Sequence, residues 1–186
     1  MAWDSTMIKE GKTIDQRVRI VLSRFEANDT ADGTKYSLGG LYVRKYISYV
    51  SKKALKRIPK KERNAISREK GVDYLRVKPK AWGVTREHMI PVSDLYEHLK
   101  KKELSKEYIS SLMPKMHIAL ITKSENKKFK RKKLGMDLTR SMPTEWWNTT
   151  TLDPLDRYRT AGLEDDIWVR DFLNDDMSPR WREERT

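Results

Sequence analysis

The sequence contains no cysteine, which excludes disulfide bonds, cysteine nucleophiles and any structural zinc site built from thiolates. It also contains no apolar run long enough to span a bilayer. The first residues, MAWDSTMIKEGK, have no apolar core of the kind found in signal peptides. We therefore expect a soluble, intracellular, cytoplasmic protein without a membrane partner. With only three histidines, there are few candidates for acid–base chemistry near neutral pH.

Acidic residues are too few to balance the basic ones, and the imbalance varies along the chain. The formal net charge is +13 over 186 residues, with a pI of about 9.8. Residues 153–186 hold ten Asp and Glu against six Lys and Arg, a net charge of −4, which leaves +17 for residues 1–152. An excess of this size favours nucleic acid as a partner over charge that serves solubility alone. The acidic segment could dimerise, shield the basic surface, contact another protein or pack as a helix on the rest of the chain.

Residues 1–70 predict a basic, helical N-terminal region. Residues 13–16 have the form of a capping box, and an apolar stripe follows to Phe25, before turn residues at 28–33. A second helix is expected from near Leu41 to Ile58, ahead of Pro59. Its polar face is basic and could be solvated or contact phosphates: Arg44, Lys45, Lys52, Lys53, Lys56 and Arg57.

Residues 71–140 predict alternating strands and helices, and residues 141–186 an irregular to helical acidic extension. Strands are expected at 72–77, 82–90 and 117–122, with two short helices between the last two, at 94–102 and 105–113. A helix capped by Ser124 and closed by Gly135 follows, with Phe129 as its core anchor. In the extension, Trp146 and Trp147 could stack on bases or pack a small core, and residues 167–173 predict a last helix. The expected fold class is α+β.

Three polar residues of this middle region fall where they could share one cleft: Glu87, His88 and Asn126. Phosphodiester hydrolysis needs a base for the attacking water, which a neutral imidazole can be near pH 7. It also needs positive charge at the phosphate, which a divalent cation held by oxygen ligands supplies. On a regular strand Glu87 and His88 point to opposite faces, so a bend before Pro91 is a condition of this interpretation.

The run Glu87-His88-Met-Ile-Pro91, then a strand, then Lys123-Ser-Glu-Asn126-Lys-Lys, resembles the HNH nucleases of the ββα-metal group. It is most similar to the variant that ends in Asn and is assigned Mg²⁺ rather than zinc. The resemblance covers residues 82–133 and implies a ββα-metal core with N-terminal helices and a mixed C-terminal extension. It also implies a bacterial or phage-encoded enzyme of restriction, phage or defence type.

By position, the resemblance implies that His88 is the general base, and that Glu87 and Asn126 hold Mg²⁺ or Mn²⁺. Glu125 is a second candidate carboxylate ligand, or its negative charge interacts favourably with the dipole of the helix that it begins. His117 stands where the family has Asn, and it could orient the base, approach the metal or simply begin the strand. Basic residues beside the site are expected to bind phosphates on either side of the scissile bond: Arg86, Lys123, Lys127, Lys128, Lys130 and Arg131.

Two functions remain open from the sequence. The first is a metal-dependent endonuclease that cuts double-stranded DNA to 5′-phosphate and 3′-hydroxyl ends, as a monomer or a homodimer. The second is a non-catalytic nucleic-acid-binding protein with a degenerate HNH-like core, which the histidine at position 117 favours. Metal dependence discriminates the two, because a protein that only binds responds to salt and not to chelation.

Overall fold

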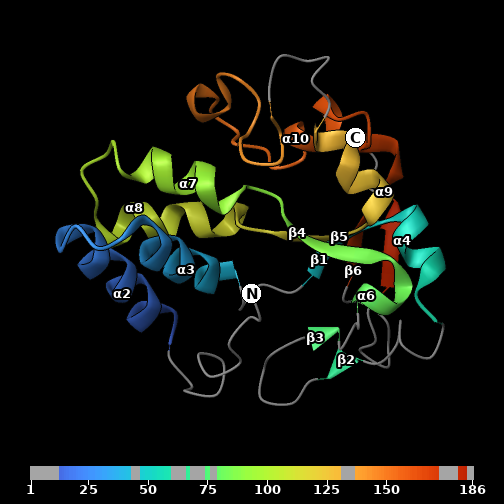
Figure 1. The fold of residues 1–186 in the computed structure, drawn as a ribbon, viewed down its shortest axis with the longest axis horizontal. Helices are drawn as coiled ribbons and strands as arrows, with labels where there is room; N and C mark the ends of the chain where they lie inside the picture. Colours follow the sequence, from blue (N-terminus) through green and yellow to red (C-terminus); the bar gives the residue numbers. More distant parts are fainter. Residues whose placement is uncertain are drawn as a thin grey trace.

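A five-stranded mixed sheet in the order β4-β5-β1-β6-β7 is the centre of the fold (Figure 1). The computed structural model describes residues 13–42, 47–59, 66–67, 74–75, 79–130, 137–171 and 180–183. The β1 and β5 strands are parallel, and every other neighbouring pair is antiparallel. The strands of this sheet are β1 (Ile47–Ser51), β4 (Val84–His88), β5 (Ile118–Thr122), β6 (Ile167–Asp171) and β7 (Arg180–Glu183).

Helices cover both faces of the sheet, which makes the fold mixed α+β. Alternate residues of a strand face opposite sides, and the buried side chains divide accordingly. Leu120 packs with Val50 and with Ala54 of α4 (Lys52–Arg57) on one face. Ala119 and Ile121 pack on the other face with the buried side chains of two short segments. Those segments are α9 (Lys123–Asn126) with the 3₁₀ helix η3 (Lys127–Lys130), and α10 (Asp156–Thr160).

A separate helical layer lies beside the β4–β5 end of the sheet (Figure 1). Its core contains Val18, Leu38, Leu95, Ile109 and Trp146. The predicted capping box at Thr13 and Gln16 is present, and the two predicted short helices between β4 and β5 are confirmed. The layer consists of α2 (Ile14–Glu26), α3 (Ala31–Tyr42), α7 (Val92–Leu99) and α8 (Lys106–Leu112). The remaining elements are β2 (Ile66–Ser67), β3 (Tyr74–Leu75), α6 (Pro79–Trp82) and the 3₁₀ turns η2 (Met113–Lys115), η5 (Trp146–Asn148) and η6 (Glu164–Asp166).

The helix predicted from Leu41 to Ile58 is wrong. The chain is helical earlier, in α3, and residues 47–51 form β1 before α4 begins. The helix was expected from an apolar stripe that includes Ile47, Val50 and Ile58, and these three residues do share one buried cluster. The spacing of apolar residues along the chain contains no information on strand pairing, and residues 47–51 pair with strands on both sides. Ser51 then caps α4 by accepting a hydrogen bond from the Ala54 N–H at 3.0 Å.

The last acidic helix predicted at 167–173 is also wrong, since residues 167–171 form β6 between β1 and β7. The predicted cap at Ser124 is displaced to Thr122, which forms a capping box with Glu125. The predicted end of that helix at Gly135 lies outside the described residues. Strands β1, β4 and β6 come one from each of the three regions expected from the sequence, and they share one sheet. Within the described chain, no helix is long and apolar enough to cross a membrane.

Candidate functional site

The candidate site lies where β4 and β5 run antiparallel and α9 follows directly. Glu87 pairs with Ala119 and His88 with Ile118, and the register is unbroken from Val84 to His88. Opposed residues of an antiparallel pair share a face. Glu87 therefore lies on the Ala119 face, which η3 and α10 cover, and His88 lies on the other. The bend expected to bring both side chains to one point does not occur between them, because β4 is regular through both residues.

Arg157 holds Glu87 on its face of the sheet. Its Nη2 donates to Glu87 Oε1 at 2.7 Å, and its side chain is fully buried, whereas that of Glu87 is 18% exposed. The same guanidinium donates to the carbonyls of Leu138 at 2.6 Å and His88 at 2.7 Å, and it lies 4.2 Å from the Phe129 ring centroid. Because all of these contacts meet at the end of β4, Arg157 ties the candidate motif to the C-terminal extension. The sequence contained no signal for this residue, since it is 70 positions from Glu87.

His88 is half-buried on the opposite face, with its ring edge-on to Tyr42 at a centroid distance of 4.5 Å. Burial, and secondarily the positive charge of Arg157, lower the pKa of His88 from 6.5 to about 4. The ring is therefore neutral at pH 7, as a proton acceptor must be. Tyr42 is itself fixed, because its hydroxyl donates to the Ile90 carbonyl at 2.8 Å.

His117 stands just before β5 and shares the face of Glu87, since it is two residues from Ala119. Its ring lies edge-on to Tyr49 at a centroid distance of 5.3 Å. Its backbone carbonyl accepts from the Met89 N–H at 3.0 Å, which extends the pairing of β4 with β5 by one residue. These contacts place His117 at the start of the strand, and its two other possible roles, orienting the base and approaching the metal, stay predictions.

Glu125 is buried and joins the two parallel strands at their carboxyl ends. Its Oε2 accepts from Ser51 Oγ at 2.7 Å, from Thr122 Oγ1 at 2.7 Å and from the Thr122 N–H at 2.8 Å. Its Oε1 is buried without a hydrogen-bond partner among the described residues. These contacts make Glu125 a link between the caps of α4 and α9. Asn126 beside it is half-buried, and its amide makes no hydrogen bond within the described part of the chain.

The carboxylate and amide oxygens near η3 belong to the ligand types that Mg²⁺ prefers. Mg²⁺ takes oxygen ligands and keeps several waters, so one carboxylate and one amide are a sufficient protein contribution. Glu87 Oε1 is bound to Arg157, which leaves Oε2 as its second donor atom, and the Asn126 amide oxygen accepts no hydrogen bond from any residue that the structure describes. Across the described ranges, no cluster of three or more His, Asp or Glu side chains could hold a metal ion. Glu87 Oε2 and the Asn126 side-chain oxygen are each of a type that a hard cation accepts, and Glu87 lies on the face of β4 that His88 does not share.

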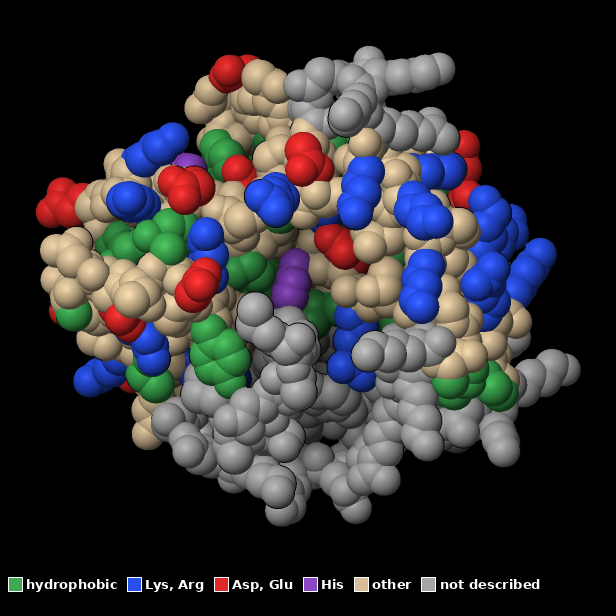
Figure 2. All heavy atoms as spheres, viewed as in Figure 1, with side chains coloured by type: hydrophobic (Ala, Val, Ile, Leu, Met, Phe, Trp, Pro, Cys, Tyr) green, Lys and Arg blue, Asp and Glu red, His purple; other side chains and the backbone are tan. Residues whose placement is uncertain are grey.

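The predicted phosphate-binding residues lie along β4, α9 and η3. Arg86, Lys123, Lys127 and Lys130 are exposed, whereas Lys128 is half-buried and donates to the Gly162 carbonyl at 3.0 Å. Arg131 lies outside the described residues. Lys and Arg side chains gather over this part of the surface, together with those of α4 (Figure 2).

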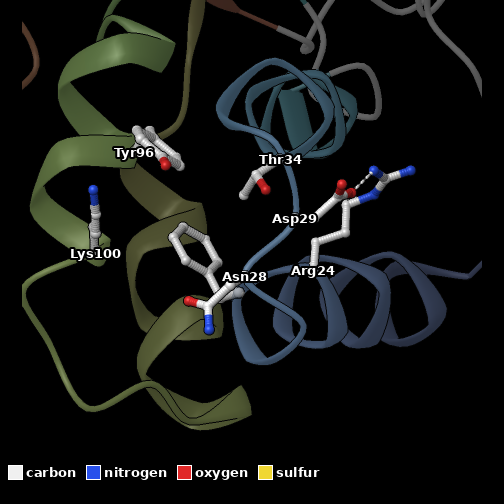
Figure 3. Close-up of a pocket in the computed structure, with 7 residues that line it drawn as sticks. Arg24, Asn28, Asp29, Thr34, Tyr96 and Lys100 are labelled. Carbon is white, nitrogen blue, oxygen red and sulfur yellow. Dashed lines mark hydrogen bonds and ion pairs between the residues drawn. The ribbon is translucent and has the colours of Figure 1, made fainter.

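The helical layer holds two further features, a pair of predicted tryptophans and a hollow. Trp147 stacks on His98 with ring centroids 3.7 Å apart, and Trp146 is buried. A hollow of about 190 Å³ separates the α2–α3 turn from α7 (Figure 3). Arg24 and Asp29 on its wall form an ion pair with each other, and it lies in the helical layer, away from Glu87. Neither feature adds a group to the candidate site.

Comparison with family models, curated proteins and solved structures finds no match to this chain. The structure therefore defines this protein by its architecture alone, a mixed α+β fold in which a short helix directly follows the β4–β5 pair.

Proposed function

We propose that this protein is a metal-dependent DNA endonuclease of the HNH type. The observation that carries the proposal is the order of β4, β5 and α9, with Glu87 and His88 at the end of the first strand and Asn126 in the helix. That order is what the motif requires of a ββα-metal core. The basic surface beside it supports DNA as the substrate, because exposed Lys and Arg neutralise backbone phosphates.

In the proposed reaction the neutral ring of His88 accepts a proton from the attacking water. Glu87 and Asn126 would hold Mg²⁺ or Mn²⁺, which would supply positive charge at the scissile phosphate and the leaving oxygen. Arg157 limits Glu87 to one free carboxylate oxygen and so sets the direction in which it can bind. Lys123, Lys127 and Lys130 position the backbone on either side. Because His88 and Glu87 face opposite sides of β4, this reaction requires a scissile phosphate placed at the end of the strand, within reach of both side chains.

Cleavage of supercoiled plasmid tests this proposal. The wild type should cut with Mg²⁺ or Mn²⁺ and stop with EDTA, and His88→Ala should lose cutting by at least about 100-fold while it retains DNA binding. His98→Gln is the matched control, because His98 packs against Trp147 in the helical layer and should leave cutting unchanged. Cutting that persists in His88→Ala would refute the role of His88, and cutting in EDTA would refute the metal.

The alternative function, a nucleic-acid-binding protein that does not cut, is favoured by the ion pair of Glu87 with Arg157. A carboxylate already neutralised by a buried guanidinium attracts a cation less strongly than a free one. This alternative predicts that the wild type retards DNA in a gel with a strong salt dependence and no effect of EDTA. Metal-dependent product from the purified protein would exclude it.

A further inference from the structure

The α4 helix presents positive charge that the proposed reaction does not use. Its sequence, KKALKR, contains four basic residues and no acidic one. Lys56 and Arg57 are exposed, and neither forms an ion pair within the described residues. Lys53 differs, because it is paired with Asp166 at 3.2 Å. The last turn of α4 therefore carries two cations that pair with no acidic side chain of the described ranges.

Two connections join α4 to α9, although the helices lie on opposite faces of the sheet. Ser51, the cap of α4, donates to Glu125 of α9 at 2.7 Å. The Gly83 carbonyl accepts both from the Lys123 N–H at 3.0 Å and from Arg57 Nη1 at 3.4 Å. Gly83 has a φ of +65°, and a Cβ there would lie 2.6 Å from Arg57 Nη1, so glycine permits this close approach. The first turn of α9 and the Arg57 guanidinium thus meet at the Gly83 carbonyl, at the start of β4.

Lys56, Arg57, Lys123, Lys127 and Lys130 together form what we name the α4–α9 basic surface. All five are exposed, and Lys and Arg gather over these elements in Figure 2. The acidic residue within α9, Glu125, is buried and bound to Ser51 and Thr122, so it is not presented to a ligand. Exposed cations on segments that present no exposed carboxylate of their own attract a polyanion.

We propose that Lys56 and Arg57 bind backbone phosphates of duplex DNA, and that they extend the contact made by α9 around the start of β4. The proposal rests on the DNA partner of the proposed function, but not on cleavage. The contact is with the backbone and positions the duplex without reading its sequence, because flexible cations at a surface recognise charge and not base edges. Each neutralised phosphate releases condensed counterions, which makes the contribution of the two residues measurable as salt dependence.

The test compares Lys56→Gln/Arg57→Gln with wild type in binding a short duplex DNA, by fluorescence anisotropy over a series of salt concentrations in EDTA. Loss of two phosphate contacts should make the slope of log affinity against log salt shallower by about 1.8, and should lower affinity at 0.15 M salt by about 30-fold. Lys101→Gln/Lys102→Gln makes the same change of charge at exposed positions between α7 and α8, well away from α4 in Figure 1. This control should keep the wild-type slope.

The outcomes separate this proposal from the proposed function. A double variant whose slope and affinity match those of the wild type overturns the assignment of α4 and leaves the DNA partner in place. An equal loss in both double variants also overturns it, because the effect would then follow from total charge. A wild type that shows no salt-sensitive binding to DNA would overturn the DNA partner, and with it this surface.

Discussion

Replacing Arg157 by methionine should destabilise the fold more than any comparable change at an exposed arginine. The Arg157 side chain is fully buried and donates to Glu87, to the Leu138 carbonyl and to the His88 carbonyl. Methionine retains an unbranched apolar stem against Phe129 but none of these donors. In the variant the Glu87 carboxylate therefore loses its positively charged partner, and the two carbonyls lose their hydrogen-bond donor.

The size of the effect follows from burial. Removing one partner of a buried ion pair costs about 3–5 kcal/mol, because the other charge remains without compensation. Glu87 is 18% exposed and gains some solvation, which places the expected loss near the lower end, about 3 kcal/mol. Arg159 is the matched control, since it pairs with Asp153 and Asp156 at 32% exposure, and Arg159→Met should cost about 1 kcal/mol or less.

Urea denaturation of Arg157→Met, Glu87→Gln and the double variant measures the coupling between the two residues. The double-mutant cycle should give a coupling free energy of at least about 1.5 kcal/mol, because each residue satisfies the other. A coupling near zero, or a loss in Arg157→Met no larger than in Arg159→Met, would refute the argument that this ion pair holds the end of β4.

Two further predictions concern the strand ends. Ser51→Ala removes both the cap of α4 and a donor to the buried Glu125, and should cost about 1–3 kcal/mol in urea, whereas Ser23→Ala on the exposed face of α2 should change stability by less than about 0.5 kcal/mol. Equal effects of the two changes would contradict the role given to Ser51. Because burial lowers the pKa of His88 to about 4, the ring is neutral in both the folded and the unfolded protein above pH 6.5, and as pH falls towards about 4 only the unfolded protein takes up the proton, which lowers the stability of the fold. The unfolding free energy should fall by up to about 3 kcal/mol more in wild type than in His88→Gln over that window, and identical pH profiles would show that the ring is not buried in its neutral form.

The order of elements from Val84 to Asn126 could be predicted from the sequence, and local physics explains why. Strand-like composition predicted β4, the spacing of apolar residues predicted α7 and α8, and the short apolar run HIALIT predicted β5. The candidate site residues came from the same stretch, because the motif places them at fixed spacing along these elements. Each of these signals lies within a few residues of the structure it predicts.

What the sequence by itself determined is therefore the local order of strand, helices, strand and helix, the basic charge of the chain, and the motif residues within that order. The tertiary structure alone decided that residues 47–51 and 167–171 are strands, because a strand is stabilised by partners distant in the chain. It alone decided that Glu87 and His88 face opposite sides, because that depends on regular pairing with β5. It alone brought Arg157 to Glu87 and Lys123 to Arg57, since packing, and no local pattern, joins residues so far apart in sequence.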